Sequence, residues 1–428
     1  MVSHDELLDD GPPVGRDLAL ATWGLFVGLA LLMFAAGLFG TLLGVRSELA
    51  GLPTLVSALI STSYYMGFLV GSRAALNALT RVGHIRAFSA LASLLAAAVL
   101  GIGLTSSAWA WALLRLVTGL CMAGQYVVAE SWLNDLADNE NRGRLLAIYN
   151  VVVIAAFGMG QVMQFAFDAR TMTGFAVGSM IVSLAVAPVA LSERAAAPPL
   201  GETHHISLRE LAKAVPTGVG SCFLVGIAHG ALSGMAAVFA TRAGLSGGQL
   251  GLFVAAPSIG GVLLQWPISA ASDDIDRRAI GAIAAVGAMM AASLLLLGPA
   301  TAPMAVLLIA VVGGLSYPLY AIAGAYTNDW IDSEHVNAAA SQLVTLYGVG
   351  AVIGPLIAGA LMNGVGTNGY FWALVVLHGL IAGFFVYRMR VWRSPLAKVP
   401  PHEASLPARA FYLPATLVMA RRGRRRAR

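Results

Sequence analysis

Long apolar runs, following one another along almost the whole chain, limit most strongly how this sequence can fold. Each run has about 20 residues or more, the length that a helix needs to cross the roughly 30 Å apolar core of a bilayer. Only 11% of the 428 residues are charged and 58% are apolar, whereas soluble proteins are about one quarter charged. The sequence therefore predicts a polytopic membrane protein and excludes a soluble enzyme.

Twelve such runs are separated by charged residues or by clusters of Gly, Pro, Asn and Asp. The segment before the first run is acidic and lacks the basic start of a secretory signal, so we expect that run to stay in the protein as a helix. We predict spans at residues 18–44, 52–77, 84–105, 108–133, 143–168, 171–191, 215–242, 247–271, 278–298, 302–328, 335–362 and 369–391.

The longest polar connection follows the sixth run and divides the chain into two parts. Within it, Ser207 and Glu210 stand three residues apart, a spacing that predicts a short helix with a capping box. The predicted parts are a cytoplasmic segment 1–17, a six-helix bundle 18–191, a cytoplasmic linker 192–214, a second six-helix bundle 215–391 and a basic cytoplasmic tail 392–428.

Lys and Arg are distributed unequally between the two sides of these spans. One side holds 22 of them and the other side three, which predicts that both termini are cytoplasmic. The last eight residues contain six arginines. We expect this tail to attract anionic lipids, and we expect no binding to nucleic acid.

Two weak similarities between the halves share an offset of about 195 residues. LTRVGHIR (79–86) aligns with SDDIDRR (272–278), and GLCMAGQYVVAE (119–130) aligns with GLSYPLYAIAGA (314–325). A common offset in register with the span count favours a duplication, as in many transporters. The predicted fold class is an all-α membrane protein whose 12 transmembrane helices form two pseudo-symmetric six-helix bundles.

The chain resembles the major facilitator superfamily over residues 18–391. AESWLNDLADNENRGRLLAIY (129–149) and YPLYAIAGAYTND (317–329) are similar to a poorly characterised bacterial branch of that family. The basic family signature after spans 2 and 8 is matched by Arg81, Gly83 and Arg86, with Thr80 in place of an Asp, and by Asp273, Arg277 and Arg278. The resemblance implies transport of a small solute, a cavity lined by spans 1, 4, 7 and 10, and a cytoplasmic gate of ion pairs.

Arg115 is the most informative single residue. It lies about 10 Å from the outer end of span 4, where a lone arginine is costly unless it faces a wet cavity or a partner. We interpret it as a cavity residue, the alternative being an arginine that extends to the headgroups. RLVTG resembles the family motif R-x-x-Q-G, with Thr118 in place of Gln, which implies a role in proton coupling. Helical spacing places Met122, Tyr126 and Glu130 on the same face.

Glu130 lies about 22 Å further along the helix than Arg115, near the cytoplasmic surface. We expect it to pair with Arg142, Arg144 or Arg86 as part of the gate, the alternative being interfacial ion pairs that have no gating role. The predicted gate residues are Arg81, Arg86, Glu130, Arg142, Arg144, Asp273, Arg277 and Arg278.

Coupling to protons requires a titratable group inside the membrane. Glu130, His229 in span 7 and His378 in span 12 are the candidates. His229, with Ser233 one turn later, is either a site residue or a packed neutral histidine, and we expect His378 to be a packing residue.

Span 10 contributes Tyr317 and Tyr320, which we interpret either as cavity-lining or as packing residues. Pro318 is expected to kink this span and to free a backbone carbonyl. Gly67-x-x-x-Gly71 and Gly350-x-x-x-Gly354 predict close contacts between helices. We expect these contacts to lie within one molecule, which we expect to be a monomer.

No acidic residue lies in the middle of a predicted span, which disfavours a cationic substrate. The sequence contains no phosphate-binding glycine loop, metal-ligand cluster or catalytic constellation, so we expect no cofactor, no metal and no enzymatic activity. We predict a secondary transporter of an anionic or polar neutral solute, coupled to protons. The alternatives are proton-driven efflux of uncharged or amphipathic compounds and a solute sensor with a transporter fold.

Overall fold

The computed structural model of the chain describes residues 16–136, 142–191, 206–297, 302–332 and 335–391, and all regular structure in these ranges is helical. The helices are α1 (Arg16–Leu49), α2 (Thr54–Val82), α3 (His84–Leu104), α4 (Ala108–Leu136), α5 (Arg142–Met163), the 3-10 turn η2 (Gln164–Ala166), α6 (Thr173–Leu184), α7 (Val186–Ala190), α8 (Leu208–Ala214), α9 (Pro216–Gly234), α10 (Ala236–Arg242), α11 (Gly247–Asp274), α12 (Arg277–Leu294), α13 (Ala302–Ser316), α14 (Pro318–Asn328), α15 (Val336–Val365) and α16 (Gly369–Val391).

Twelve helical segments are long and apolar enough to cross a bilayer, in agreement with the prediction. Span 1 reaches Leu49, beyond its predicted end at residue 44, because Arg46 does not end the helix. The Arg46 Nη1 donates to the carbonyl of Gly103 at 3.2 Å, and its Cζ lies 5.3 Å from the ring centroid of Trp111. A carbonyl and an aromatic face thus hold this charge at the end of the span.

Span 10 is broken between α13 and α14, where Tyr317 separates the two helices and Pro318 begins the second. Proline has no N–H and its ring crowds the preceding turn, so the regular hydrogen-bond ladder stops there. The helix is interrupted at the position where the kink is predicted. Span 7 is broken in a similar way at Met235, between α9 and α10.

The two halves of the molecule repeat one pattern of helix pairing. In residues 16–191, called here the N-terminal half, α1 packs against α5, α2 against α4 and α3 against α6. In residues 206–391, the C-terminal half, α9 packs against α15, α11 against α13 and α12 against α16. These are the corresponding spans of each half, which confirms the prediction of two pseudo-symmetric bundles.

Small residues bring the paired helices together as the sequence predicts. Gly67 and Gly71 face the backbone of α4, and Gly350 and Gly354 face the backbone of α9. A Cβ atom at Gly71 would lie 2.7 Å from the Cα of Leu120. Because backbone atoms cannot move aside as a flexible side chain can, these contacts require glycine.

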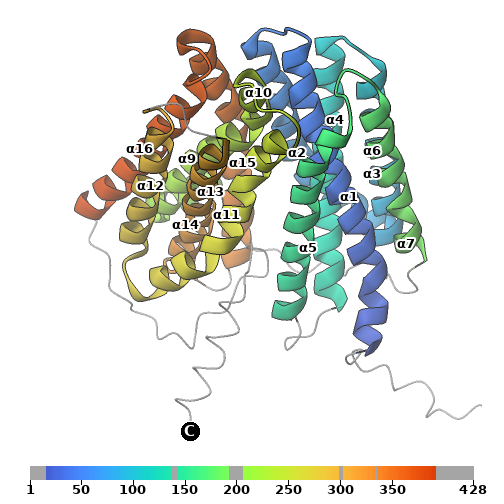
Figure 1. Ribbon diagram of the computed structural model, residues 1–428. Coiled ribbons are helices and arrows are strands. Elements are labelled where there is room, and N and C mark those ends of the chain that lie inside the picture. Colours follow the sequence, from blue (N-terminus) through green and yellow to red (C-terminus); the bar gives the residue numbers. More distant parts are fainter. Residues whose placement is uncertain (1–15, 137–141, 192–205, 298–301, 333–334, 392–428) are drawn as a thin grey trace, which may run out of the picture.

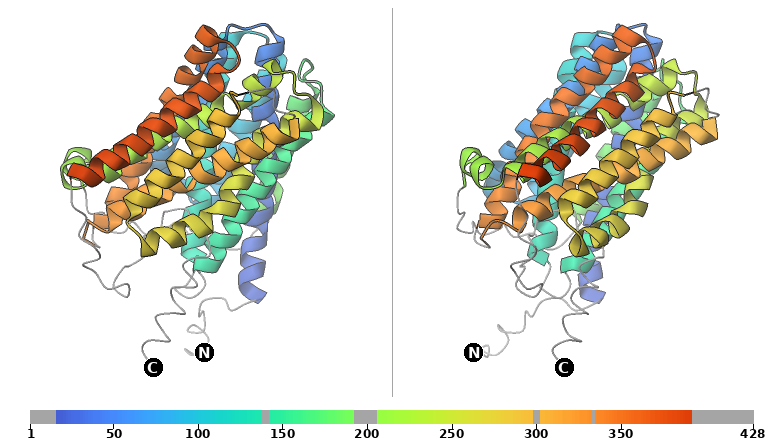
Figure 2. Two further views of the ribbon diagram at one scale, coloured as in Figure 1. Left: turned by 60° about the vertical axis from the view of Figure 1, so that its left-hand side comes forward. Right: turned by 90° about the vertical axis from the view of Figure 1, so that its left-hand side faces the viewer.

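The halves lie side by side, the blue-to-green half next to the yellow-to-red half (Figures 1 and 2). The first turn of α1 lies at the bottom of Figure 1, and α16 runs downward from the top. We call the lower end of the bundle the inner end and the opposite end the outer end, after the orientation that the positions of Lys and Arg predict.

The short linker helix α8 carries the predicted capping box. The backbone N–H of Ser207 donates to Glu210 Oε2 at 2.8 Å, and the backbone N–H of Glu210 donates to Ser207 Oγ at 3.2 Å. The hydrogen bonds from the backbone N–H and the hydroxyl of Ser207 lower the pKa of the Glu210 carboxyl.

Candidate functional site

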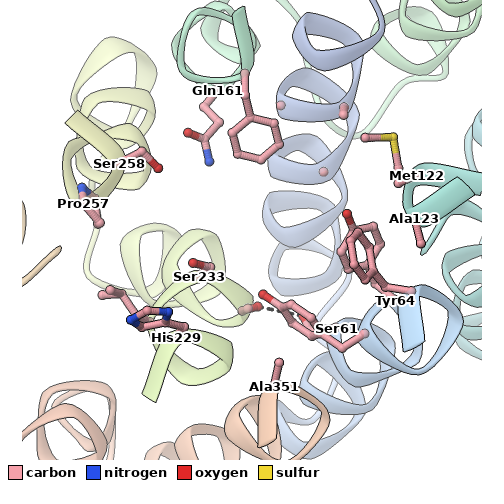
Figure 3. Close-up of a pocket in the computed structure, with 18 of the residues that line it drawn as sticks. Ser61, Tyr64, Met122, Ala123, Gln161, His229, Ser233, Pro257, Ser258 and Ala351 are labelled. Carbon is pink, nitrogen blue, oxygen red and sulfur yellow. Dashed lines mark hydrogen bonds between the residues drawn. The ribbon is translucent and has the colours of Figure 1, made fainter. Parts of the chain in front are cut away.

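A cavity of about 560 Å³ lies between the two halves and is lined by spans 1, 2, 4, 5, 7, 8, 10 and 11. This size is within the range of about 300–1,000 Å³ that is usual for small-molecule sites. Figure 3 shows His229 and Ser233 on one side of the cavity, opposite Tyr64, Met122 and Ala123. The predicted site and gate residues that line it are Arg115, Met122, Tyr126, Glu130, His229, Ser233, Tyr317 and Tyr320.

Arg115 faces the cavity from α4. Its Cζ lies 4.5 Å from the ring centroid of Tyr64, and a Cβ atom at Gly40 of α1 would lie 3.9 Å from its Nη1. Among the described residues the guanidinium has neither an ion-pair nor a hydrogen-bond partner. A contact with a ring face leaves the N–H groups of an arginine available. Arg115 therefore presents hydrogen-bond donors and a positive charge to whatever occupies the cavity.

Thr118 does not reach the cavity, although the sequence placed it in the site. Its side chain is completely buried, and its hydroxyl donates to the backbone carbonyl of Arg115 at 2.9 Å. Thr118 is three residues after Arg115, so its side chain leaves the helix about 60° away from that of Arg115. It belongs to the packed interior of the N-terminal half.

Aromatic rings that the sequence analysis did not select form much of the cavity wall. Tyr64, Tyr65 and Phe68 of α2 and Tyr347 of α15 all line the cavity. Span 2 contained a usable signal, because the hydroxyl-rich run Ser61 to Tyr65 interrupts its apolar sequence.

His229 is buried and uses both ring nitrogens. Nε2 lies 3.0 Å from the carbonyl oxygen of Ser316, and Nδ1 lies 3.0 Å from the hydroxyl of Tyr347. A carbonyl can only accept, so Nε2 carries the hydrogen, and in the neutral ring Nδ1 accepts from Tyr347. The Tyr320 N–H bonds to the Tyr317 carbonyl at 3.4 Å across the helix break. The Ser316 carbonyl, which is free of the helical ladder at the break, is thus satisfied by a side chain from span 7.

His378 of α16 binds the same residue from the other side. Its Nδ1 lies 2.7 Å from the carbonyl of Leu374 and its Nε2 lies 2.8 Å from Ser316 Oγ. By the same reasoning Nδ1 donates and Nε2 accepts from the hydroxyl. His378 is completely buried and does not line the cavity. A chain of hydrogen bonds therefore leads from Tyr347 at the cavity through His229 and Ser316 to His378 in the outer helix layer.

Glu130 lines the cavity near the inner end, and its Oε1 accepts a hydrogen bond from the hydroxyl of Tyr149 at 3.3 Å. Arg81 and Arg86 are exposed. The side chains of Arg142 and Arg144, which the sequence places next to Glu130, lie outside the described residues.

The remaining predicted gate residues form ion pairs inside the C-terminal half. Arg277 bonds to Asp273 at 2.9 Å and to Asp329, at the end of span 10, at 2.7 Å. Arg278 bonds to Asp276 at 2.7 Å. Burial on its own would raise the pKa of Asp276, but hydrogen bonds from the side chain and backbone of Arg278 and the charge of this arginine lower it.

The outer end joins the two halves through an ion pair that the sequence analysis did not find. Arg242 of α10 binds Glu48 of α1 through two hydrogen bonds of 2.8 Å, and its Nη1 donates to Thr54 of α2 at 2.7 Å. Ser61 donates to the carbonyl of Gly234 at 2.7 Å in the same region. These contacts connect the two halves at the outer end.

Twelve spans in two related halves around a solute-sized cavity define a membrane transporter built from two bundles. A sequence model of the Major Facilitator Superfamily matches residues 218–425, and a model described as sugar (and other) transporter matches residues 40–192. The chain belongs to the major facilitator superfamily and is a multi-pass bacterial membrane transporter of that type.

Relatives agree with this assignment, and solved structures share the fold. The MFS-type transporter YcaD of Salmonella typhimurium is 27% identical over 346 residues, which cover 80% of this chain and 89% of that protein. YcaD of Escherichia fergusonii is 26% identical over 377 residues, with coverage of 88% and 97%.

The nucleoside transporter NupG has a similar fold, with a TM-score of 0.67 at 14% identity and coverage of 87% of this chain and 99% of that chain. A bacterial homologue of the human lysosomal transporter Spinster, solved in an inward-facing and occupied conformation, has a TM-score of 0.69 at 16% identity, with coverage of 90% and 100%.

Proposed function

We propose that the protein is a secondary transporter that moves a small anionic or polar neutral solute across the bacterial inner membrane, with both termini in the cytoplasm. The single observation that carries this proposal is the Arg115 guanidinium, which faces the cavity without an ion-pair partner among the described residues. A half-buried charge inside a membrane span is costly unless a ligand neutralises it. The solute enters and leaves as the two halves rock about the cavity, which opens alternately at the inner and outer ends.

Ligand binding to the purified full chain tests the substrate charge. Thermal unfolding is measured with lactate and phenylacetate as anions, glucose and uridine as neutral solutes, and tetraphenylphosphonium as a cation. A bound ligand at 100 times its dissociation constant adds about 2.7 kcal/mol of stability. We expect an anion or a polar neutral solute to stabilise the wild type, and we expect Arg115→Gln, but not Arg115→Lys, to abolish stabilisation by the anion.

Stabilisation by tetraphenylphosphonium that is equal in wild type and Arg115→Gln would contradict the proposal and favour efflux of amphipathic compounds. Counterflow of the stabilising solute in proteoliposomes separates a transporter from a sensor, because a sensor binds the solute without exchanging it.

For proton coupling, the proposed group is His229, whose hydrogen bonds connect the cavity wall to the break in span 10. His229→Gln keeps an N–H donor for the Ser316 carbonyl and removes the titratable ring. We expect this variant to retain counterflow and to lose accumulation driven by a pH gradient. His378→Gln is the matched control, because His378 binds the same serine but lies outside the cavity lining. Unchanged accumulation in His229→Gln would exclude His229 as the coupling group.

In the same proposal, the predicted gate residues Arg81, Arg86, Glu130, Arg142, Arg144, Asp273, Arg277 and Arg278 close the inner end when the cavity faces outward. The expected partners are the solute, protons and the anionic lipids around the basic tail, and the protein acts as a monomer.

A further inference from the structure

Two rows of aromatic rings line the cavity, one from each half. The N-row, from α2 and α4, consists of Tyr65, Tyr64, Phe68 and Tyr126, with successive centroid distances of 5.4, 6.2 and 5.9 Å. The C-row, from the C-terminal half, consists of Tyr317, His229, Tyr347 and Tyr320, with successive distances of 4.8, 5.6 and 5.0 Å. All eight rings line the cavity, and Tyr64 and His229 lie on opposite sides of it in Figure 3.

The rings within each row meet at an angle. His229 packs edge-on against both Tyr317 and Tyr347, with interplanar angles of 61° and 72°. Aromatic rings attract one another most strongly in offset or edge-to-face arrangements. A flat ring that enters between the rows can therefore meet ring faces and ring edges on both sides at once, whereas an aliphatic body of equal volume gains only its burial.

The charges of the lining are few and far apart. Among the described residues that line the cavity, Arg115 and Glu130 are the charged ones, and both belong to α4. Fifteen residues of helix separate them by about 22 Å. A monoanion near Arg115 is therefore neutralised, whereas a second negative charge or an ammonium group at that level has no opposite charge there.

We propose that the solute is an aromatic monoanion, whose carboxylate or similar head binds Arg115 and whose ring lies between the N-row and the C-row. This inference rests on the proposed transport function and specifies its substrate class. The in-plane N–H groups of Arg115 match a carboxylate in a bidentate manner, while the contact with Tyr64 holds the guanidinium beside the N-row.

Five related probes test the class on the purified full chain by isothermal titration. Phenylacetate carries the ring and one negative charge, cyclohexylacetate lacks the aromatic ring, phenylacetamide lacks the charge, phenylmalonate has a second carboxylate, and phenethylamine reverses the charge. We expect phenylacetate to bind at least about tenfold more tightly than each of the other four probes. Loss of a pair of aromatic contacts lowers the affinity by about a factor of ten, and so does an unmatched charge.

Tyr320 offers a variant pair that isolates the ring. Tyr320→Phe keeps the ring and is expected to bind phenylacetate as the wild type does, whereas Tyr320→Leu is expected to bind it about fivefold to tenfold more weakly. Tyr387→Leu, which removes the ring of an exposed tyrosine outside the cavity lining, is the control and is expected to have no effect.

The outcomes separate this inference from the proposal on which it rests. Equal, Arg115-dependent binding of cyclohexylacetate and phenylacetate would overturn the aromatic class and leave an anion transporter. Equal binding of phenylacetamide and phenylacetate, unaffected by Arg115→Gln, would overturn the monoanion and leave a transporter of a polar neutral solute. Tighter binding of phenethylamine than of phenylacetate, unaffected by Arg115→Gln, would overturn both. If none of the five probes binds, the aromatic class is overturned, and transport of another solute is still tested by the wider ligand panel.

Discussion

The two ends of the bundle hold the halves in different ways. At the outer end, Arg242 of the C-terminal half forms hydrogen bonds with Glu48 and Thr54 of the N-terminal half. At the inner end, the ion pairs that the structure describes, such as those of Arg277, join residues of the C-terminal half to one another. Among the described residues, the ion pair that joins the two halves therefore lies at the outer end. Charged residues in a loop signature thus give no indication by themselves of which conformation they stabilise.

The largest expected effect comes from the closest backbone contact at the outer end. A Cβ atom at Gly251 of α11 would lie 2.7 Å from the Cα of Val162 in α5, on the other half. The added methyl group of Gly251→Ala should therefore push α11 and α5 apart at the outer end. We expect it to destabilise the conformation in which the halves are joined there by about 1–3 kcal/mol. Spin labels at the exposed residues Ser106 and Ser246 should report a longer distance between the halves.

Gly248→Ala is the matched control, since a Cβ atom at Gly248 of the same helix meets no atom within 4 Å. An unchanged distance in Gly251→Ala would mean that the outer interface yields without opening. Close backbone packing at the outer end would then not explain why the two ends differ.

A somewhat smaller effect is expected from Glu48→Gln. The variant removes the charge that Arg242 binds at 2.8 Å, and both side chains are mostly buried, with 17% and 25% of their surfaces exposed. Loss of this partly shielded pair should cost the closed outer end about 1–2 kcal/mol, between the values for exposed and buried pairs. The rate at which a membrane-impermeant thiol reagent labels a cysteine placed at Ser57, a lining residue near the outer end, should rise about fivefold or more.

Asp168→Asn provides the comparison for Glu48→Gln. Asp168 pairs with Arg170 of the same half at 4.0 Å, and both side chains are more than half exposed. We expect no change in labelling, and an equal rise in both variants would show that the loss of any outer charge, not of an inter-half bond, is responsible.

The smallest effect is expected at the inner end, from Asp276→Asn. The pKa of Asp276 is lowered in the folded protein, so its charge stabilises the fold above the unfolded pKa of about 3.9. This stabilisation is lost as the pH falls through the folded value. Thermal unfolding of the wild type should therefore lose its advantage over Asp276→Asn progressively as the pH falls from about 5 to below the unfolded pKa of about 3.9. The distance between labels on the two halves should stay the same, because the Asp276–Arg278 pair lies within one half.

Much of the fold follows from local patterns in the sequence. The spans, the break before Pro318 and the glycine contacts depend on hydropathy, on a missing N–H and on a missing side chain, all of which can be read residue by residue. Arg115 was equally visible, because a charge inside an apolar span is rare.

What escaped prediction depends on pairing between distant segments. Glu48 and Arg242 each lie near the end of a span, where a charge is ordinary, and nothing in either local sequence indicates that they meet across 194 residues. The rings of Tyr64 and Tyr347 look like packing or lipid-facing residues until α2 and α15 are known to border the cavity. Thr118 was misplaced because a position in a family motif does not show which way a side chain points.

The hydrogen bond from His229 to the Ser316 carbonyl also bears on the order in which the protein is assembled. Span 10 enters the membrane with a backbone acceptor that its own helix does not satisfy, and lipid offers no donor. Span 7, which is synthesised earlier, already carries the donor, so span 10 has a partner as soon as it arrives. His378 in span 12 is synthesised last and adds the second bond, to the Ser316 hydroxyl. The hydrogen bonds at the break in span 10 can therefore form in the order in which the spans are synthesised, first from span 7 on the cavity side and then from span 12 in the outer helix layer.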